Sequence, residues 1–69
     1  MITGDTLRQL RIIKGIKQLT IAKKLGVSQQ AYSKIEKSNN IDENKLNNLL
    51  PILGITKEEL AEMIKIFSR

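Results

Sequence analysis

The chain has 69 residues, of which 41% are hydrophobic and 28% charged, and it carries a formal net charge of +5. It contains no cysteine and no histidine, which excludes disulfides, thiolate metal sites and the commonest general base and metal ligand. No apolar run approaches the roughly 18–20 residues of a membrane span, and no signal-peptide pattern is present. We therefore expect one cytoplasmic domain over residues 1–69, with no cofactor, no metal and no membrane partner.

The charge is distributed unevenly along the chain. The first 37 residues carry a net charge of +6, whereas the remainder carries −1. A basic half joined to a nearly neutral half suggests that one surface meets a polyanion. A solvated basic surface without such a partner would give the same pattern, so charge alone does not decide between the two.

The first predicted helix follows Thr3, whose hydroxyl can accept a hydrogen bond from a free amide of the first turn. Leu7 and Leu10 lie on one face of this helix, which we expect to be buried. The helix is expected to stop at Gly15, because glycine adopts the left-handed conformation at little cost.

Two short helices joined by a tight turn come next. The first spans about residues 18–25 and ends at Gly26, and the second is capped by Ser28 and spans about 28–37. Helices joined in this way cross at a steep angle, roughly 90–120°, so the second should project outward with its N-terminal turn leading. Val27 is expected to fill the corner from inside. The inward positions are Ile21, Ala22, Tyr32 and Ile35.

Two more helices are predicted after a loop of turn-forming residues. Asp42 is the expected cap of the fourth helix, and Pro51 is expected to kink it or to end it near Leu50, because proline removes a backbone hydrogen bond. Thr56 and Glu59 form a capping-box pattern at the start of the fifth. The expected buried stripe of the fourth helix is Leu46, Leu49, Leu50 and Leu53, and the fifth helix carries an apolar stripe of Leu60, Ile64 and Phe67. With no strand-like alternation, the sequence predicts an all-α fold of five short helices.

An enzymatic role is not expected. Without histidine or cysteine, a nucleophile would have to be a serine or threonine activated by lysine or a carboxylate. The acidic pairs Asp42–Glu43 and Glu58–Glu59 lie at predicted helix starts, where they balance the positive end of the helix dipole. Neither a glycine-rich phosphate loop nor a metal-ligand spacing is present.

The outward face of the helix that Ser28 caps carries side chains suited to reading DNA. Gln29 and Gln30 lead it, and a glutamine amide matches the N6/N7 edge of adenine in the major groove. Lys34 can donate to guanine or to phosphate, and Ser28 and Ser33 are short donors suited to phosphate contacts. Two adjacent glutamines are also good exposed helix formers. Their place in the first turn of a projecting helix within a basic half favours base reading.

These motifs follow one another along most of the chain. They are Leu7-Arg8-x-Leu10-Arg11, Gly15-Ile16-Lys17-Gln18, Ile21-Ala22-Lys23-Lys24-Leu25-Gly26-Val27-Ser28-Gln29-Gln30, Tyr32-Ser33-Lys34-Ile35-Glu36 and Leu53-Gly54-Ile55-Thr56-x-x-Glu59-Leu60. In this order they closely resemble the phage repressor and Cro type of helix-turn-helix, the Xre-like family, over about residues 4–62. The resemblance implies a five-helix bundle of the lambda-repressor-like type, with the helix-turn-helix at about 18–37. Helices four and five, at about 42–67, would complete the core and offer a dimer surface.

The resemblance also implies roles for particular residues. Gln18 would bond a phosphate and brace Gln29, which would place the two side by side. Arg11 and Glu36 match a partly buried salt bridge that ties the first helix to the end of the third. The base-reading positions would be Gln29, Gln30 and Lys34, with Ser33 near the backbone or bases. We expect phosphate contacts from Gln18, Lys17, Ser28, Lys23, Lys37 and Arg8.

Four positions depart from the family pattern, and one of them is Pro51 within the fourth helix. Lys17 stands where a capping residue is usual, which loses a cap worth about 1 kcal/mol but adds a positive charge. Ser38 replaces a common glycine, so either that turn is less tight or Asn39 takes the left-handed conformation. Tyr32 replaces an aliphatic core residue, and its hydroxyl must reach solvent or a partner.

Hydrophobic side chains crowd the C-terminal helix. Ile66 points off the stripe formed by Leu60, Ile64 and Phe67, so one face cannot bury all of them. We therefore favour a homodimer whose surface includes Ile64, Ile66 and Phe67, bound to palindromic half-sites about one helical turn, near 34 Å, apart. The alternative is that Ile64 and Phe67 complete the core while Ile66 is a single exposed residue.

The sequence thus predicts a sequence-specific regulator of transcription that binds double-stranded DNA, a repressor that reads the major groove and is associated with the nucleoid when bound. The alternative is a protein-binding module on the same fold, such as an antitoxin or a phage anti-regulator.

Overall fold

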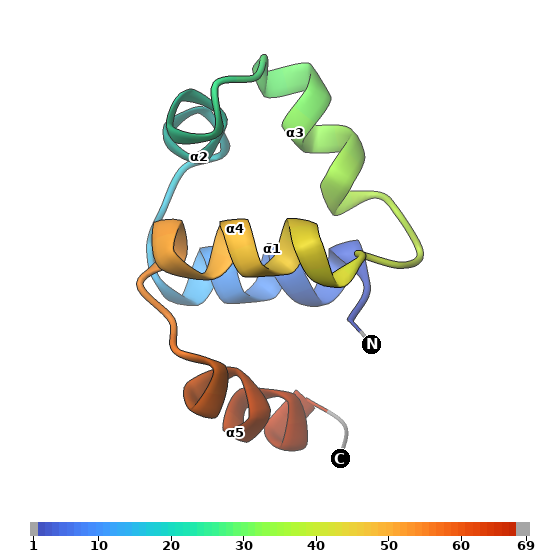
Figure 1. Cartoon of the computed structure of the whole chain (residues 1–69), viewed down its shortest axis with the longest axis vertical. Coiled ribbons are helices and arrows are strands. Elements are labelled where there is room, and N and C mark those ends of the chain that lie inside the picture. Colours follow the sequence, from blue (N-terminus) through green and yellow to red (C-terminus); the bar gives the residue numbers. More distant parts are fainter. Residues whose placement is uncertain (1, 68–69) are drawn as a thin grey trace.

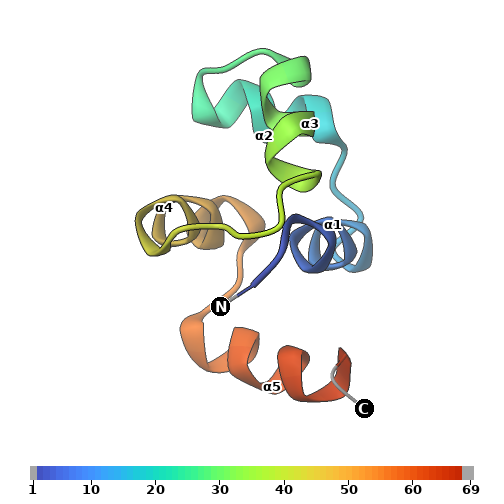
Figure 2. The same ribbon diagram turned by 90° about the vertical axis from the view of Figure 1, so that its right-hand side faces the viewer.

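The computed structural model describes residues 2–67, in which five α-helices lie at three levels. Helices α2 and α3 lie at one end, α1 and α4 run side by side in the middle, and α5 lies at the other end (Figures 1 and 2). The bounds are α1 Gly4–Ile13, α2 Gln18–Leu25, α3 Gln29–Glu36, α4 Glu43–Leu53 and α5 Lys57–Phe67. The only strand-like feature within these residues is a single bridge between Ile2 and Ile41. The prediction of an all-α fold of five helices is confirmed.

The predicted caps account for where four of the helices begin. Side-chain oxygens of Thr3, Ser28 and Asp42 accept hydrogen bonds from backbone amides three residues later, at 3.2, 3.1 and 2.8 Å. Thr56 and Glu59 form the reciprocal capping box, at 3.1 and 3.3 Å. Lys17 precedes α2 without a side-chain cap, as the sequence predicts. Local side-chain chemistry therefore defines these helix starts.

The core is formed by side chains from all five helices and from three segments outside them, at Ile2, Ile41 and Ile55. Leu7, Leu10, Ile21, Ala22 and Tyr32 are fully buried, and Leu49, Leu50, Leu53 and Leu60 are nearly so. Leu46, predicted to lie in the buried stripe of the fourth helix, is half-buried at the edge of the core. Ile35, Ile64 and Phe67 are half-buried there as well. Leu46 and Ile64 face a surface groove that also includes Leu60, which leaves part of both side chains in contact with solvent.

Helix α4 continues through Pro51 to Leu53, so the predicted early end near Leu50 is wrong. The proline removes one hydrogen bond, but only two helical residues follow it. Gly54, at φ +70°, then donates its N–H to the Pro51 carbonyl, and Ile55 donates to Leu50 at 3.0 Å. This C-terminal cap holds the last turn in place, so a break at Pro51 is not required.

The turn between α2 and α3 is built on Gly26, which takes the left-handed conformation at φ +75°. Val27 does not fill the corner from inside, because its side chain remains 41% exposed. Ala22 and Tyr32 already occupy the interior of the corner. Val27 instead lies at the rim of a shallow surface hollow, beside Leu25 and residues of α3 and α4.

The start of α1 lies directly against the end of α3. The Gly4 amide donates to the Ser38 carbonyl at 2.9 Å. A Cβ atom added to Gly4 would collide with the backbone carbonyls of Ile35 and Glu36. A glycine is therefore required for the two helices to approach this closely, and this contact fixes the C-terminal end of α3.

Helix α3 ends at Glu36 with Lys37 as its C-cap, and no left-handed residue follows at Ser38 or Asn39. No residue other than glycine has a positive φ between residues 2 and 67, so Asn39 does not take the left-handed conformation considered above. The Ile35 carbonyl at the helix end instead accepts two hydrogen bonds from Ser38, from its hydroxyl at 2.8 Å and from its backbone N–H at 3.2 Å.

Candidate nucleic-acid interface

Helix α3 divides cleanly into an inward and an outward side. Tyr32, on the inward side, is fully buried, whereas the outward Gln29, Gln30 and Lys34 are exposed. Ser33 is half-buried. Because Ser28 caps the helix, its first turn begins at the two glutamines. The three predicted base-reading side chains are thus available on one projecting helix at one end of the molecule (Figure 1).

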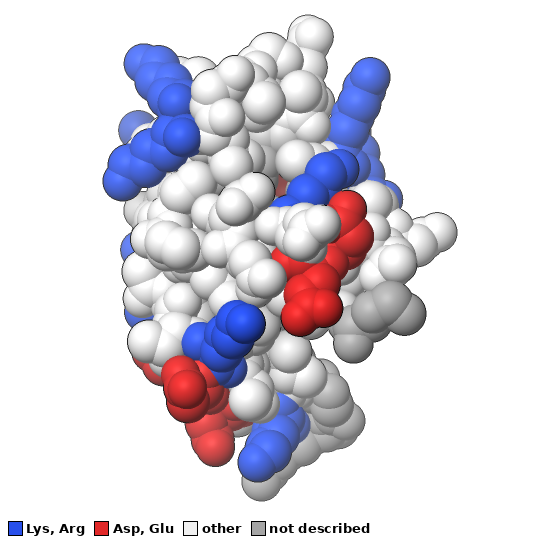
Figure 3. Space-filling view, in the orientation of Figure 1, with Lys and Arg blue, Asp and Glu red and all other residues white. Residues whose placement is uncertain are grey.

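Positive charge flanks this end on two sides. Lys and Arg side chains project from both sides of the upper part of the molecule, over α2 and α3, whereas the acidic side chains gather in its middle and lower parts (Figure 3). Among the predicted phosphate contacts, Lys17, Lys23, Ser28 and Lys37 are exposed around α2 and α3. Arg8 is exposed on α1, one level below them (Figure 1). The arrangement suits an extended polyanion that crosses this end.

A buried ion pair holds α3 onto α1. Arg11 Nε donates to Glu36 Oε2 at 2.6 Å and Nη2 donates to Oε1 at 3.3 Å, so the pairing is bidentate. The side chains are only 13% and 2% exposed. Arg11 Nη1 also donates to the Ile16 carbonyl at 2.9 Å, which anchors the segment before α2. The salt bridge implied by the resemblance is therefore present and joins three parts of the chain.

Burial opposes ionisation of Glu36, but its hydrogen bonds outweigh that effect. Those from Arg11 contribute most, and the net result lowers the pKa of Glu36 below the ordinary value of a glutamate. The hydrogen bond to Glu36 likewise raises the already high pKa of Arg11. Glu36 is therefore a carboxylate at neutral pH, and it can only accept hydrogen bonds.

Gln18 and Gln29 lie side by side, as the resemblance implies. Gln29 Nε2 is 3.5 Å from Gln18 Oε1. Gln18 Nε2 also donates to Glu36 Oε1 at 2.9 Å, a contact that the sequence reasoning missed. Only one amide N–H of Gln18 then remains for a phosphate. The sequence signal for this contact was weak, because Gln18 and Glu36 are far apart along the chain.

The hydroxyl of Tyr32 is buried and has no hydrogen-bond partner within the described residues. Burial, followed by the neighbouring Glu36 carboxylate, raises the pKa of this phenol, so the group stays neutral. The Glu36 carboxylate and the Arg11 guanidinium lie close enough to affect this hydroxyl, but no hydrogen bond of standard geometry joins it to either group. A buried hydroxyl without a partner lowers stability, because it loses its bonds to water on folding.

Tyr32→Phe removes this hydroxyl and leaves the ring in place. We expect the free energy of unfolding in urea to rise by about 1 kcal/mol, because the folded protein no longer desolvates an unpaired group. A fall of similar size would show that the hydroxyl is hydrogen-bonded in solution.

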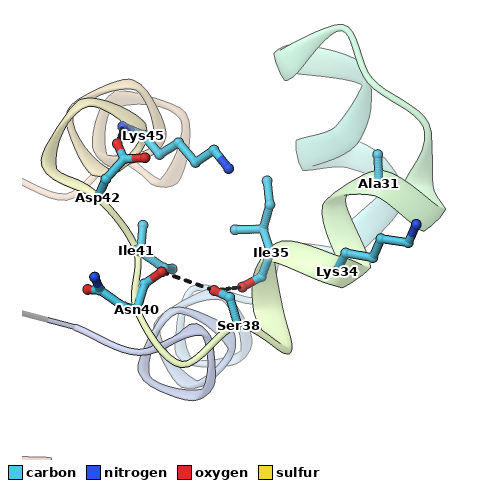
Figure 4. A pocket seen from close by; sticks show the side chains of 8 residues that line it. All are labelled: Ala31, Lys34, Ile35, Ser38, Asn40, Ile41, Asp42 and Lys45. Atoms are coloured by element: carbon cyan, nitrogen blue, oxygen red, sulfur yellow. Dashed lines mark hydrogen bonds between the residues drawn. The ribbon is translucent and has the colours of Figure 1, made fainter.

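A hollow of about 220 Å³ separates the C-terminal half of α3 from the start of α4. Lys45 extends across it towards Ile35, and the Ser38 hydroxyl lies at its floor (Figure 4). On this side α3 is therefore separated from α4. Its position depends on α1 and α2, through Gly4, Arg11 and the buried side of the helix.

Other kinds of site have little support in residues 2–67. No three side chains among His, Cys, Asp and Glu gather there in a way that could hold a metal ion. No helix in the same range is both long and apolar enough to cross a bilayer.

Comparison with known proteins agrees with this geometry. A helix-turn-helix family model matches residues 7–50, which is more than half of the chain and includes α2, the turn and α3. No curated protein and no solved structure matches the chain. The chain belongs to the helix-turn-helix family, of the Cro/C1 or Xre-like type, and is a DNA-binding regulator in the general sense of that family.

Proposed function

We propose that this protein is a sequence-specific repressor of transcription that reads the major groove of double-stranded DNA with α3. The observation that carries the proposal is the exposure of Gln29, Gln30 and Lys34 on the outward side of α3, with Tyr32 buried behind them. Lysines around α2 and α3 supply the electrostatic capture. A plot of the logarithm of the binding constant against the logarithm of the salt concentration should have a slope of about −0.9 for each phosphate neutralised.

Two substitutions separate base reading from electrostatic capture. Gln29→Ala should weaken binding to the preferred duplex by roughly 1–3 kcal/mol and leave binding to random duplex unchanged, because only a base contact is lost. Lys23→Ala should weaken binding to both duplexes alike and reduce the salt slope by about 1, because Lys23 contacts phosphate. Fluorescence anisotropy at several salt concentrations measures both effects. If the two variants behave identically on the two duplexes, Gln29 does not read a base.

The proposal includes a homodimer formed through α5. Ile66 is 67% exposed on this helix, whereas Ile64 and Phe67 are partly packed against the core. A large apolar side chain exposed at this end, opposite α3, leaves the DNA-reading face free. A twofold dimer in which the two α5 helices pack side by side, so that both α3 helices face the same DNA, would read two halves of a palindromic site.

Ile66→Lys should abolish the dimer, because a charge cannot be buried at its centre without a partner. We expect light scattering to give twice the chain mass of 7.8 kDa for the unsubstituted protein and the single chain mass for the variant. Ile12→Lys is the matched control, since Ile12 is 51% exposed but lies on α1. A monomer at every concentration would instead favour the alternative, a surface for a different protein.

A further inference from the structure

A line of side-chain hydrogen bonds leads from the buried end of α3 back to its exposed first turn. Glu36 is joined to Gln18 at 2.9 Å, and Gln18 is joined to Gln29 at 3.5 Å. Glu36 lies at the C-terminal end of the helix and its side chain is 2% exposed, so it does not reach a groove itself. Gln29 lies at the opposite end of the same helix, in the predicted base-reading position.

We propose that Glu36, acting through Gln18, determines the orientation of the Gln29 side-chain amide, that is, the positions of its oxygen and nitrogen relative to the DNA. The inference rests on the proposed function, since it concerns how Gln29 reads a base. Glu36 is a positioning residue in this account.

The first step follows from the chemistry of the carboxylate. Glu36 accepts two hydrogen bonds from Arg11, and as an ionised group it has no proton to donate. The Gln18 atom that faces it must therefore be the NH₂ group. The opposite orientation of the Gln18 amide would place its oxygen against a carboxylate oxygen in a buried site.

The second step transfers this polarity to Gln29. With its nitrogen held by Glu36, Gln18 presents its oxygen to Gln29, which must respond with a donor. At 3.5 Å the contact is long and stabilises little by itself. The bias on the Gln29 amide comes mainly from its alternative orientation, which would place the Gln29 oxygen against the Gln18 oxygen.

The result is a fixed order of donor and acceptor on Gln29. Its nitrogen lies on the Gln18 side, and its oxygen and second N–H remain for the groove. An adenine edge presents one acceptor and one donor side by side, so only one orientation of the A·T pair fits this order. Gln30 has no side-chain hydrogen bond among residues 2–67 and is the internal comparison.

The test begins on the free, full-length protein. ¹⁵N relaxation of side-chain amides should show Gln29 more ordered than Gln30 in the unsubstituted protein. Two variants should lower the order parameter of the Gln29 side-chain amide to that of Gln30. The first is Gln18→Met, which leaves the Arg11–Glu36 pair intact. The second is Glu36→Gln, whose amide can accept or donate a hydrogen bond. If Glu36→Gln does not fold, Arg11→Met/Glu36→Gln replaces it, because that pair of changes leaves no lone buried charge. Unchanged order at Gln29 in these variants would overturn the proposal.

The second measurement is base preference. The base pair that Gln29 reads is identified as the position of the site at which Gln29→Ala loses the base preference of the unsubstituted protein. There, the unsubstituted protein should prefer A·T over T·A by roughly tenfold, and Gln18→Met and Glu36→Gln should reduce this ratio to about one. The reductions should not add in the double variant, and preference at the pair read by Gln30 should persist. A Glu36 variant that loses stability but keeps the ratio would show a purely structural role. If the unsubstituted protein has no preferred sequence, the proposed function fails. The relaxation data alone then decide whether Glu36 orients Gln29 through Gln18.

Discussion

Arg11→Met should lower the free energy of unfolding by about 3–5 kcal/mol, which is the cost of leaving one buried charge without its partner. Glu36 would retain only its hydrogen bond from Gln18, and the Ile16 carbonyl would lose its donor. A chain of 69 residues is expected to have only about 3–10 kcal/mol of stability in total, so much of the variant should be unfolded at 37 °C. Urea unfolding followed by circular dichroism measures the change.

Lys14→Met is the matched control for this substitution. Lys14 pairs with Glu59 at 3.8 Å, and these side chains are 32% and 50% exposed, far more than Arg11 and Glu36, so the removal of Lys14 should cost less than about 1 kcal/mol. Equal losses from the two substitutions would contradict the claim that burial gives the Arg11 pair its importance.

Acid provides a second check on the Arg11 result. Because the pKa of Glu36 is lowered in the folded protein, Glu36 contributes to stability at pH values above about 4.3, the ordinary pKa of a glutamate. This contribution is lost as the pH falls through the pKa of Glu36 in the folded protein. In Arg11→Met the folded pKa should instead be raised by burial, so protonation stabilises the variant. The stability difference between the two proteins should therefore shrink as the solution is acidified from pH 7. A difference that is independent of pH would show that Glu36 is not the group affected.

Gly4→Ala should lower the free energy of unfolding by about 2 kcal/mol or more, because the added methyl group collides with backbone carbonyls rather than with flexible side chains. The sign of the effect is the informative part. In an exposed helix the same substitution would raise stability by about 1 kcal/mol, since alanine is the better helix former. Thermal unfolding distinguishes the two outcomes, and stabilisation would show that α1 and α3 are further apart than the structure places them.

Much of the fold could be predicted from the sequence because its signals are local. Thr3, Ser28 and Asp42 cap helices within three residues of themselves, and Gly26 ends α2 where a left-handed residue is needed. The exposure of Gln29 and Gln30 follows from the same local reasoning, since Tyr32 fixes which side of α3 faces inward.

The features that could not be predicted depend on contacts between distant segments. Nothing in the local sequence around Gly4 indicates that the end of α3 lies against it. The exposure of Val27 depends on what already fills the corner. The contact between Gln18 and Glu36 likewise requires the packed arrangement of α2 on α3. The passage of α4 through Pro51 is an exception, because the cap at Gly54 and Ile55 that permits it is local.

Selection of bound duplexes from a random pool by the purified protein tests the central claim most directly. The account predicts enrichment of one motif made of two inverted halves about one helical turn apart, with adenine among the bases that Gln29 and Gln30 read. Recovery of the pool without any enriched sequence, under salt conditions where the protein binds DNA, would contradict the claim that α3 reads bases.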